Sequence, residues 1–386
     1  MPVEVREVEN VRDLKKFVLF PFSLYKDSKY WVPPLIRSQM DTLRKDKNPA
    51  FEYCEAKYWL AYKEGEIVGR IAGIINRKAI EVWKKEYARF CWIDFIDDEH
   101  VSRALIDELE HWVRSKGLEG IYGPMGFTTF EQQGMLVDGF NEPATFASAY
   151  NYAYYPVHLE KHGYRKEVDY VEFEVKATEG VPEKAERICN IILRRENLQL
   201  VKAKSKKELL PYAPQVFEVL NAAYSPLFGF VPLTEKEINM YIKKFFSFIQ
   251  PEFVTIVVDK NRRVIGFQIS VPSLARSFQK AKGKLFPFGF FHIMKELKKP
   301  KSIDFLIVGI LPEYQGKGVN AIFMTDLTKA ALSRGIDTAE TNAELEHNVK
   351  IQSFWKYYSS RLHKRKRIYV KTFNLNQKND SETQLT

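Results

Sequence analysis

One order of local sequence patterns occurs twice in this chain of 386 residues. Each occurrence begins with two apolar runs joined by a short polar turn, in residues 58–75 and 253–271. A glycine stands early in the second run of both, at Gly69 and at Gly266. A third strand-like run, an amphipathic helix that ends at a glycine, a further strand and a Tyr-Tyr segment follow in each case. The repetition predicts two copies of one α/β domain.

The boundary between the copies is marked by the Gly- and Pro-containing segment KATEGVPEK, and a helical pattern follows at residues 183–196. We therefore predict a first domain in residues 1–178 and a second in residues 179–373. Residues 374–386 are polar, which predicts a disordered tail.

Composition excludes several classes of protein. With 45% hydrophobic and 14% aromatic residues, the chain can bury substantial cores. It has no apolar stretch of the roughly 18 residues that a membrane span needs, and its amino terminus does not resemble a secretory signal. The three cysteines are isolated, which disfavours a disulfide framework or a zinc site. We expect a cytoplasmic protein without a metal.

The net charge of +10 is uneven. Residues 1–175 hold 24 Lys and Arg against 29 Asp and Glu, a balance of −5. The remaining residues hold 59 − 24 = 35 basic and 49 − 29 = 20 acidic side chains, a balance of +15. The second half is therefore suited to a polyanion or a phosphate-rich co-substrate, although a basic face without a ligand has the same signature.

Residues 304–327, DFLIVGILPEYQGKGVNAIFMTDL, combine a strand, a glycine-containing loop and a helix amino terminus. Glycines let successive main-chain N–H groups turn toward one point, and the helix dipole adds positive potential there. Lys317 adds a charge. The spacing matches neither a P-loop nor a dinucleotide fingerprint. This segment predicts an anion site.

The loop resembles the acetyl-CoA pyrophosphate loop of the GNAT superfamily of N-acyltransferases, whose pattern is [RQ]-x-x-G-x-[GA]. Gln315 and Gly318 match, whereas Asn320 stands where Gly or Ala is usual. The resemblance implies two tandem GNAT-like domains, each a mixed, mostly antiparallel sheet flanked by helices. It implies acetyl-CoA or another acyl-CoA as co-substrate, held by Gly309, Ile310, Leu311, Gln315, Gly316, Lys317, Gly318, Val319, Asn320 and Asn348.

The resemblance also implies a proton donor for the departing thiolate, on a helix after Asn348. Trp355 stands where a Tyr is customary, so Tyr358 is the substitute and Tyr357 the next candidate. Alternatively, the two tyrosine rings only anchor the helix. Glu340 and Glu344, on or after the fifth strand of the second copy, are candidate bases, although exposed carboxylates are often only solvated.

The first copy has Asp97, Asp98 and Glu99 at the corresponding turn, where carboxylates would repel a pyrophosphate. We therefore interpret it as a degenerate copy that does not bind CoA. The amide- and aromatic-rich stretch at residues 122–155 predicts an acceptor pocket that includes Gln132, Gln133, Tyr150 and Asn151. The alternative is a loop that only seals the domain interface.

Two further segments leave several hypotheses open. Residues 272–302 insert four phenylalanines among lysines between the third and fourth strands of the second copy. They form a lid, contact an anionic membrane surface or pack on the core. Residues 361–371, RLHKRKRIYVK, complement the 3′-phosphate of CoA, bind RNA or form a solvated edge strand.

The resemblance implies transfer of an acyl group, most simply acetyl, from CoA to an amine of a small molecule or peptide. Direct attack through a tetrahedral intermediate is expected, because no cysteine lies near the motifs. The alternatives are a tandem-GNAT transferase that uses aminoacyl-tRNA and a non-catalytic CoA-binding protein, and nucleic acid is the less favoured partner. The acceptor, the acyl length and the oligomeric state are left open by the sequence.

Overall fold

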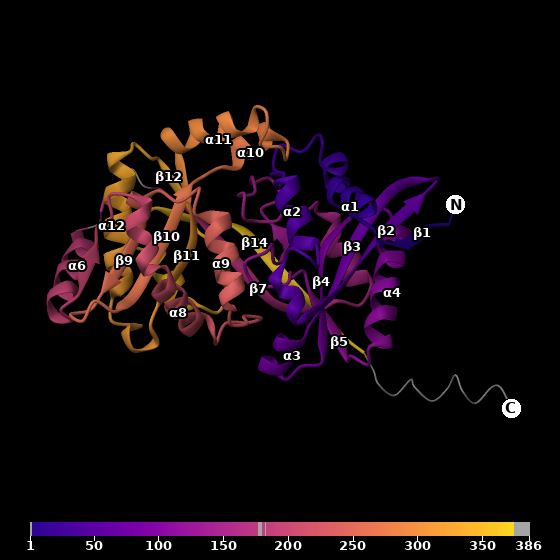
Figure 1. Cartoon of the computed structure of the whole chain (residues 1–386), viewed down its shortest axis with the longest axis horizontal. Coiled ribbons are helices and arrows are strands. Elements are labelled where there is room, and N and C mark those ends of the chain that lie inside the picture. The colour runs from indigo at the N-terminus through magenta and orange to yellow at the C-terminus, as the bar shows by residue number, and fades with distance from the viewer. Residues whose placement is uncertain (1, 177–179, 182, 374–386) are drawn as a thin grey trace.

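The structure, a computed structural model, describes residues 2–176, 180–181 and 183–373. The tail expected at residues 374–386 lies outside the described residues. Figure 1 shows two α/β halves side by side, the amino-terminal half in indigo to magenta and the carboxy-terminal half in magenta to yellow. In the described part of the chain, no helix is both long and apolar enough to cross a lipid bilayer.

The amino-terminal half follows the predicted order of hairpin, strand, helix and strand. Its strands are β1 (Glu4–Glu7), β2 (Cys54–Lys63), β3 (Glu66–Asn76), β4 (Tyr87–Phe95), β5 (Gly120–Gly123), β6 (Met135–Asp138) and β7 (Arg165–Lys176). Its helices are α1 (Val11–Leu24), α2 (Ile36–Leu43), α3 (Arg77–Trp83), α4 (Glu99–Ser115) and α5 (Tyr154–Lys161), with a 3-10 turn η1 (Pro49–Glu52).

The carboxy-terminal half repeats this order after the predicted connecting helix α6 (Glu183–Arg195). Its strands are β8 (Gln199–Val201), β9 (Val254–Val258), β10 (Val264–Pro272), β11 (Ser302–Ile310), β12 (Thr338–Glu340), β13 (Glu344–Leu345) and β14 (Ser360–Thr372). Its helices are α7 (Lys206–Leu209), α8 (Ala213–Tyr224), α9 (Glu235–Phe245), α10 (Ala275–Ala281), α11 (Gly289–Lys298), α12 (Val319–Ser333) and α13 (Val349–Trp355). Its 3-10 turns are η2 (Leu210–Tyr212), η3 (Pro251–Phe253) and η4 (Pro312–Tyr314).

The glycine that both copies share early in the second hairpin strand is explained by helix packing. A β-carbon on Gly69 would lie 2.8 Å from Leu105 Cδ1 of α4, and one on Gly266 would lie 2.9 Å from Phe323 Cζ of α12. Both distances are shorter than a van der Waals contact, so a larger residue would push the helix away. The repeated glycine thus lets the long helix of each half lie directly on its sheet.

The strands of both halves form one 14-stranded sheet in the order β1-β2-β3-β4-β5-β14-β7-β12-β11-β10-β9-β8, with β6 paired to β14 and β13 to β7. The last strand, β14, lies between β5 and β7 and so completes the sheet of the amino-terminal half (Figure 1). In turn, β7 pairs with β12 of the carboxy-terminal half. The halves exchange their final strands, so residues 1–178 and 179–373 each contribute to both halves of the sheet.

The basic segment 361–371 lies in β14, which has strands on both sides. The hypothesis that this segment is a solvated edge strand is therefore wrong. The side chains of Lys364 and Lys366 are each 2% exposed, and both pair with the carboxylate of Glu172. Buried and paired ammonium groups are not available to a CoA phosphate or to RNA, which lowers the support for the other two hypotheses.

Candidate active site

The strands β11 and β12 lie side by side only at one end. They are parallel and paired from Ser302 and Thr338 to Asp304 and Glu340. Beyond this point β12 ends, and β13 pairs with β7 instead. The rest of β11 keeps β10 on one side and has no neighbouring strand on the other within the described residues. The sheet is therefore open at its centre, along one edge of β11.

A cavity of about 330 Å³ lies at this divergence and takes its lining from both halves. Its aromatic wall comprises Phe130, Tyr170, Phe217, Tyr224, Phe228, Phe230, Tyr241, Phe245, Phe246, Phe305, Phe323 and Trp355. Its polar groups include Glu131, Gln133, Ser148, Glu172, Gln268, Asn320, Thr341, Asn342, Glu344, Asn348 and Lys366. A large apolar wall with a smaller number of polar groups is typical of a site for an organic ligand.

The predicted anion loop has the geometry of an open helix amino terminus. β11 ends at Ile310, η4 follows, and α12 begins at Val319. Gly316 and Gly318 have φ values of 75° and 87°, which glycine adopts without strain. A β-carbon on Gly316 would meet no atom within 4 Å, so there is open space beside the loop. Main-chain N–H groups and the helix dipole at this place suit a phosphate.

Two side chains of the loop already have partners. Lys317 Nζ lies 3.7 Å from Glu196 Oε2 of the chain that follows α6, so its charge is partly balanced. Gln315 Nε2 donates a hydrogen bond to the carbonyl of Ile310 at 3.0 Å and ties the loop to the end of β11. The anion site therefore depends more on main-chain groups than on the lysine.

The corresponding turn of the amino-terminal half is closed by its own carboxylates. Asp98 caps α4 by accepting a hydrogen bond from the main-chain N–H of His100 at 2.9 Å. The same carboxylate pairs with Lys63 at 2.8 Å. These contacts agree with the interpretation that the first copy stabilises its helix by charge and offers no phosphate site.

Alternate main-chain groups of β11 face the divergence. The carbonyl of Leu306 accepts a hydrogen bond from Asn342 Nδ2 across the gap at 2.6 Å. The N–H of Leu311, in contrast, donates to a β10 carbonyl at 2.9 Å, and Gly309 pairs with β10. Because neighbouring residues of a strand point their main-chain groups in opposite directions, Val308 faces the gap like Leu306. Of the three residues predicted to contact pantetheine, only Ile310 faces the same way.

Glu344, at the start of β13, is a carboxyl group in the cavity wall. Its Oε1 accepts a hydrogen bond from Trp355 Nε1 at 2.9 Å, whereas its Oε2 is buried without a hydrogen-bond partner among the described residues. Burial raises the pKa of Glu344 to about 7, although the bond from Trp355 opposes this effect. A carboxyl group that titrates near neutrality beside a cavity is suited to accept a proton from a bound molecule.

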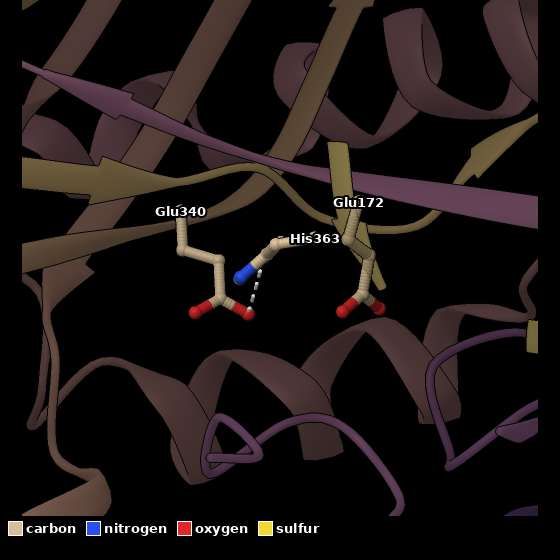
Figure 2. Close-up of side chains that lie close together, drawn as sticks. All are labelled: Glu172, Glu340 and His363. Carbon is tan, nitrogen blue, oxygen red and sulfur yellow. Dashed lines mark ion pairs between the residues drawn. The ribbon is translucent and has the colours of Figure 1, made fainter. Parts of the chain in front are cut away.

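Glu340, the other predicted base, belongs to a buried charge network where β7, β12 and β14 meet. Lys364 pairs with both Glu340 and Glu172, and His363 Nε2 lies 3.7 Å from Glu340 Oε1 (Figure 2). Burial raises the pKa of Glu340 to about 8 against the opposing charge of Lys364. Burial also lowers the pKa of His363 to about 4. Glu340 does not line the cavity, so its position favours a structural role.

Three residues of this network are close enough to be considered as metal ligands. One ligand atom from each of Glu172, Glu340 and His363 lies within 4.8 Å of the others, and Figure 2 shows His363 between the two carboxylates. However, the Lys364 ammonium bonds Glu340 and lies 3.3 Å from Glu172 Oε2. The carboxylates are therefore already neutralised by a fixed cation, and we assign this cluster to the joint between the halves.

Replacing Lys366 with Met is expected to lower the free energy of unfolding by about 3 kcal/mol. Lys366 Nζ lies 2.6 Å from Glu172 Oε1 and 2.8 Å from Ser148 Oγ, so the variant leaves a buried carboxylate with one ammonium partner fewer. Lys161→Met removes an exposed pair with Glu99 and should cost less than about 1 kcal/mol. Urea unfolding followed by circular dichroism measures both, and equal effects would contradict the importance of the buried pair.

The pH dependence of this contribution has a defined sign. Burial alone would raise the pKa of Glu172, but the charges of Lys366 and Lys364 lower it from 4.5 to about 2. A carboxyl group whose pKa is lower in the folded state stabilises the fold above pH 4.5 and loses this effect as the pH falls toward 2. The loss should be smaller in the Lys366→Met variant, because that variant lacks one of the two positive charges that lower the pKa of Glu172.

Neither Tyr357 nor Tyr358 lines the cavity. Tyr357 is 50% exposed, with Lys184 Nζ 4.8 Å from its ring centre. Tyr358 packs against the core that α12 covers, and burial raises its pKa to about 12. These positions favour the alternative in which the two rings anchor the helix.

The four predicted acceptor-pocket residues are not together. Gln133 lines the cavity, and its Oε1 is buried with no hydrogen-bond partner in the described part of the chain. Tyr150 and Asn151 bond to main-chain groups inside the amino-terminal half. The main-chain carbonyl of Gln132 accepts a hydrogen bond from a cysteine. Gln133 is thus the member of this set that stays a candidate for substrate contact.

Sequence reasoning missed Tyr224, the last residue of α8. It lines the cavity together with the predicted residues Asn320 and Asn348. Burial raises its pKa to about 12, and a hydrogen bond with the main chain of Val308 opposes this effect. A single tyrosine at a helix end belongs to no recognisable sequence motif. Only the packing of α8 against β11 identifies Tyr224 as a cavity residue.

The fold and this site together define a class of protein. No family model matches the chain. Among solved structures, it is similar to a tandem GNAT protein from the clavulanic acid biosynthesis pathway, with a TM-score of 0.56 and 11% identity over 96% of this chain and 98% of that one. It is also similar to a GCN5-related N-acetyltransferase from Sphaerobacter thermophilus, with a TM-score of 0.52 and 11% identity over 96% and 95% of the two chains. The chain has the tandem GNAT fold, as the loop resemblance predicted.

Two known proteins are similar to the chain over nearly its full length. Protein YghO of Escherichia coli (strain K12) is 27% identical over 374 residues, 95% of each chain. A protein named bacterial ceramide synthase, from Caulobacter vibrioides, is 26% identical over 382 residues, which cover 96% of this chain and 97% of that protein.

Proposed function

We propose that this chain is an N-acyltransferase that transfers a long acyl chain from acyl-CoA to the amine of a long-chain base, the reaction that forms a ceramide. The tandem GNAT fold and the open glycine loop before α12 support acyl-CoA as the donor. Similarity over nearly the whole chain to a protein named bacterial ceramide synthase supports a lipid amine as the acceptor.

The observation that carries the proposal is the apolar cavity at the divergence of β11 and β12. An acetyl group would leave most of about 330 Å³ empty, whereas an acyl chain or the alkyl chain of the acceptor would fill it. Each buried methylene group contributes about 0.8 kcal/mol to binding. We therefore favour a long acyl chain over the acetyl group that the superfamily resemblance suggested as the simplest case.

The chemistry that we assign is direct transfer. Glu344 accepts a proton from the ammonium group of the acceptor, and the neutral nitrogen then attacks the thioester carbonyl. The Val308 N–H exchanges its hydrogen bond with the Tyr224 hydroxyl for one with the carbonyl oxygen as negative charge develops there. Tyr224, whose hydroxyl lies beside Val308, donates a proton to the departing thiolate and regains one from the nitrogen as the amide forms. Glu344 then releases its proton to solvent. The three cysteines are buried and lie outside the cavity lining, so no covalent acyl-enzyme is proposed.

Release of the CoA thiol tests the proposal, with sphinganine as acceptor and a donor series from acetyl-CoA to stearoyl-CoA. We expect kcat/KM for palmitoyl-CoA to exceed that for acetyl-CoA at least about a hundredfold, because each methylene adds roughly fourfold in affinity until the cavity is filled. Glucosamine, a small amine, should be a poor acceptor. Mass spectrometry of the amide product confirms N-acylation.

Two outcomes would contradict the proposal in different ways. A preference for acetyl-CoA with a small amine would show that the cavity does not hold an alkyl chain. CoA binding without thiol release on any amine would favour the non-catalytic alternative. The aminoacyl-tRNA alternative has less support, because Lys364 and Lys366 of β14 are buried and paired.

A further inference from the structure

The segment between β10 and β11 presents four phenylalanine rings to solvent. Phe286, Phe288, Phe290 and Phe291, here called the phenylalanine cluster, are 77%, 71%, 45% and 67% exposed. Met294 of α11 is also exposed. The hypothesis that these rings pack on the domain core is therefore wrong. A contiguous group of large exposed apolar side chains marks an interaction surface.

The phenylalanine cluster is surrounded by positive charge. Residues 276–301 contain seven lysines and one arginine, all of them exposed, and a single carboxylate, that of Glu296. None of the eight cations forms an ion pair with another residue that the structure describes. Their charges are thus free to attract an anionic partner.

The opposite side of the same segment is fixed to the amino-terminal half. Phe278 of α10 and Ile293 and Leu297 of α11 are buried in the core of that half. The carbonyl of Gly283 accepts a hydrogen bond from the N–H of Ile36, at the start of α2, at 3.0 Å. The two helices therefore form a platform that holds the phenylalanine cluster outward, which disfavours a lid folded over the cavity.

The platform and the glycine loop before α12 lie at opposite ends of β11. The platform leads into β11 at Ser302, whereas the loop follows its last residue, Ile310. Figure 1 shows α10 and α11 along one edge of the molecule, over the junction of the halves. Phe248, the neighbour of the cavity residue Ile249, packs against Phe278 of α10 with ring centres 6.2 Å apart. One end of the cavity therefore lies close to the platform.

We propose that residues 275–301 dock the protein onto an anionic lipid bilayer, with the phenylalanine cluster inserted among the headgroups. Aromatic rings gain from leaving water at this depth, and lysines around them bind anionic lipid headgroups. The near absence of carboxylates fits a uniformly negative lipid surface. If the proposed function also holds, the water-soluble donor and the membrane-borne acceptor reach one site from opposite ends of β11.

Co-sedimentation with vesicles tests the docking without any turnover. We expect the full chain to bind vesicles of phosphatidylcholine with one-third phosphatidylglycerol at least about tenfold more strongly than phosphatidylcholine alone, with the difference lost at high salt. Phe290→Ser combined with Phe291→Ser should lower the partition coefficient at least about tenfold. Val82→Ser combined with Leu332→Ser, at exposed apolar positions elsewhere, is the matched control and should bind like the unchanged protein.

A second variant tests the contribution of the lysines to vesicle binding separately from that of the phenylalanine cluster. Lys298→Glu combined with Lys299→Glu should lower binding to the anionic vesicles at least about tenfold, because each lysine near the surface contributes about fivefold. Unchanged binding in the phenylalanine variant overturns the proposal. So does a dimer of the full chain that this variant converts to a monomer, because the platform would then join two copies. Thiol release on a detergent-solubilised acceptor reports on the proposed function separately and should persist in all these variants.

Discussion

Gly316→Asp is expected to weaken the binding of acyl-CoA at least about a hundredfold. The new carboxylate would stand in the open space beside the loop, where we place the diphosphate. Two unit charges about 4 Å apart near a protein surface repel by about 4 kcal/mol, and about 1.4 kcal/mol corresponds to a tenfold change in affinity. Aspartate tolerates the φ value of 75° at this position, so the fold should persist. Titration calorimetry with CoA measures the effect.

Gly65→Asp provides the matched control for this experiment. Gly65 lies in the turn between β2 and β3, has a φ value of 83°, and a β-carbon added there would likewise meet no atom within 4 Å. The two substitutions therefore impose the same strain and charge at different places. Gly318 is a poorer choice, because its β-carbon would lie 3.2 Å from Ile192 Cδ1 of α6. Equal CoA affinity in the Gly316 and Gly65 variants would remove the loop from the donor site.

Glu344→Gln is expected to lower kcat by about a hundredfold to a thousandfold, because the amine would lose its proton acceptor. In the unchanged enzyme, kcat/KM should rise with pH and level off above about 7, where burial places the pKa of Glu344. The sign follows from the mechanism, since a general base acts only when it is ionised. In the variant this rise should disappear, and the affinity for acyl-CoA should stay within about twofold.

Stability measurements keep the Glu344 experiment interpretable. A carboxyl group whose pKa is raised in the folded state stabilises the fold at low pH and loses this effect as the pH rises from 4.5 to about 7. The neutral glutamine should therefore leave the melting temperature at about pH 8 unchanged or higher. Glu340→Gln is the comparison, because it alters the ion pair with Lys364. This variant should change the melting temperature, whereas its kcat/KM should still rise with pH. If Glu340→Gln abolishes the rise of kcat/KM with pH and Glu344→Gln does not, the base is Glu340.

The parts of the fold that the sequence predicted are those with local signals. The two hairpins, the long helices after them and the loop at residues 315–318 each carry a pattern of apolar spacing or glycine position that acts within a few residues. Gly69 and Gly266 are the clearest example, because their equal places in the two copies correspond to the same close packing of a helix on a strand. Local rules were therefore sufficient to identify the duplication.

The exchange of final strands was not predictable in the same way. The pairing of β14 with β5 joins residues more than 240 positions apart. The composition of a strand does not indicate which distant strand will pair with it. Its run of Lys and Arg side chains indicated an exposed strand, because charged residues are rarely buried without partners. The partner, Glu172 on β7, is what makes burial of Lys364 and Lys366 acceptable.

Only part of the candidate site could be predicted, because several of its residues come from distant parts of the chain. The loop residues and Glu344 follow from motif position in the second copy, and both occupy places that suit the proposed chemistry. The proton donor that we propose, Tyr224, did not follow from the sequence, because it reaches the cavity from a helix far earlier in the chain. Tyr358 was chosen instead by its spacing from Asn348, and it does not line the cavity. The hydrogen-bonding roles of Tyr150 and Asn151 also depend on distant main-chain groups.

The exchanged strands set an order for folding during synthesis. When the first 176 residues have left the ribosome, β5 and β7 exist, but the strand that must stand between them has not been made. The amino-terminal half must therefore wait until residues 360–372 emerge and insert, with one edge of β5 unpaired and with β7 unpaired on both edges, because β12, β13 and β14 all come later. Shortening the chain at residue 359 would therefore remove the strand that joins β5 to β7 and leave the sheet of the amino-terminal half incomplete.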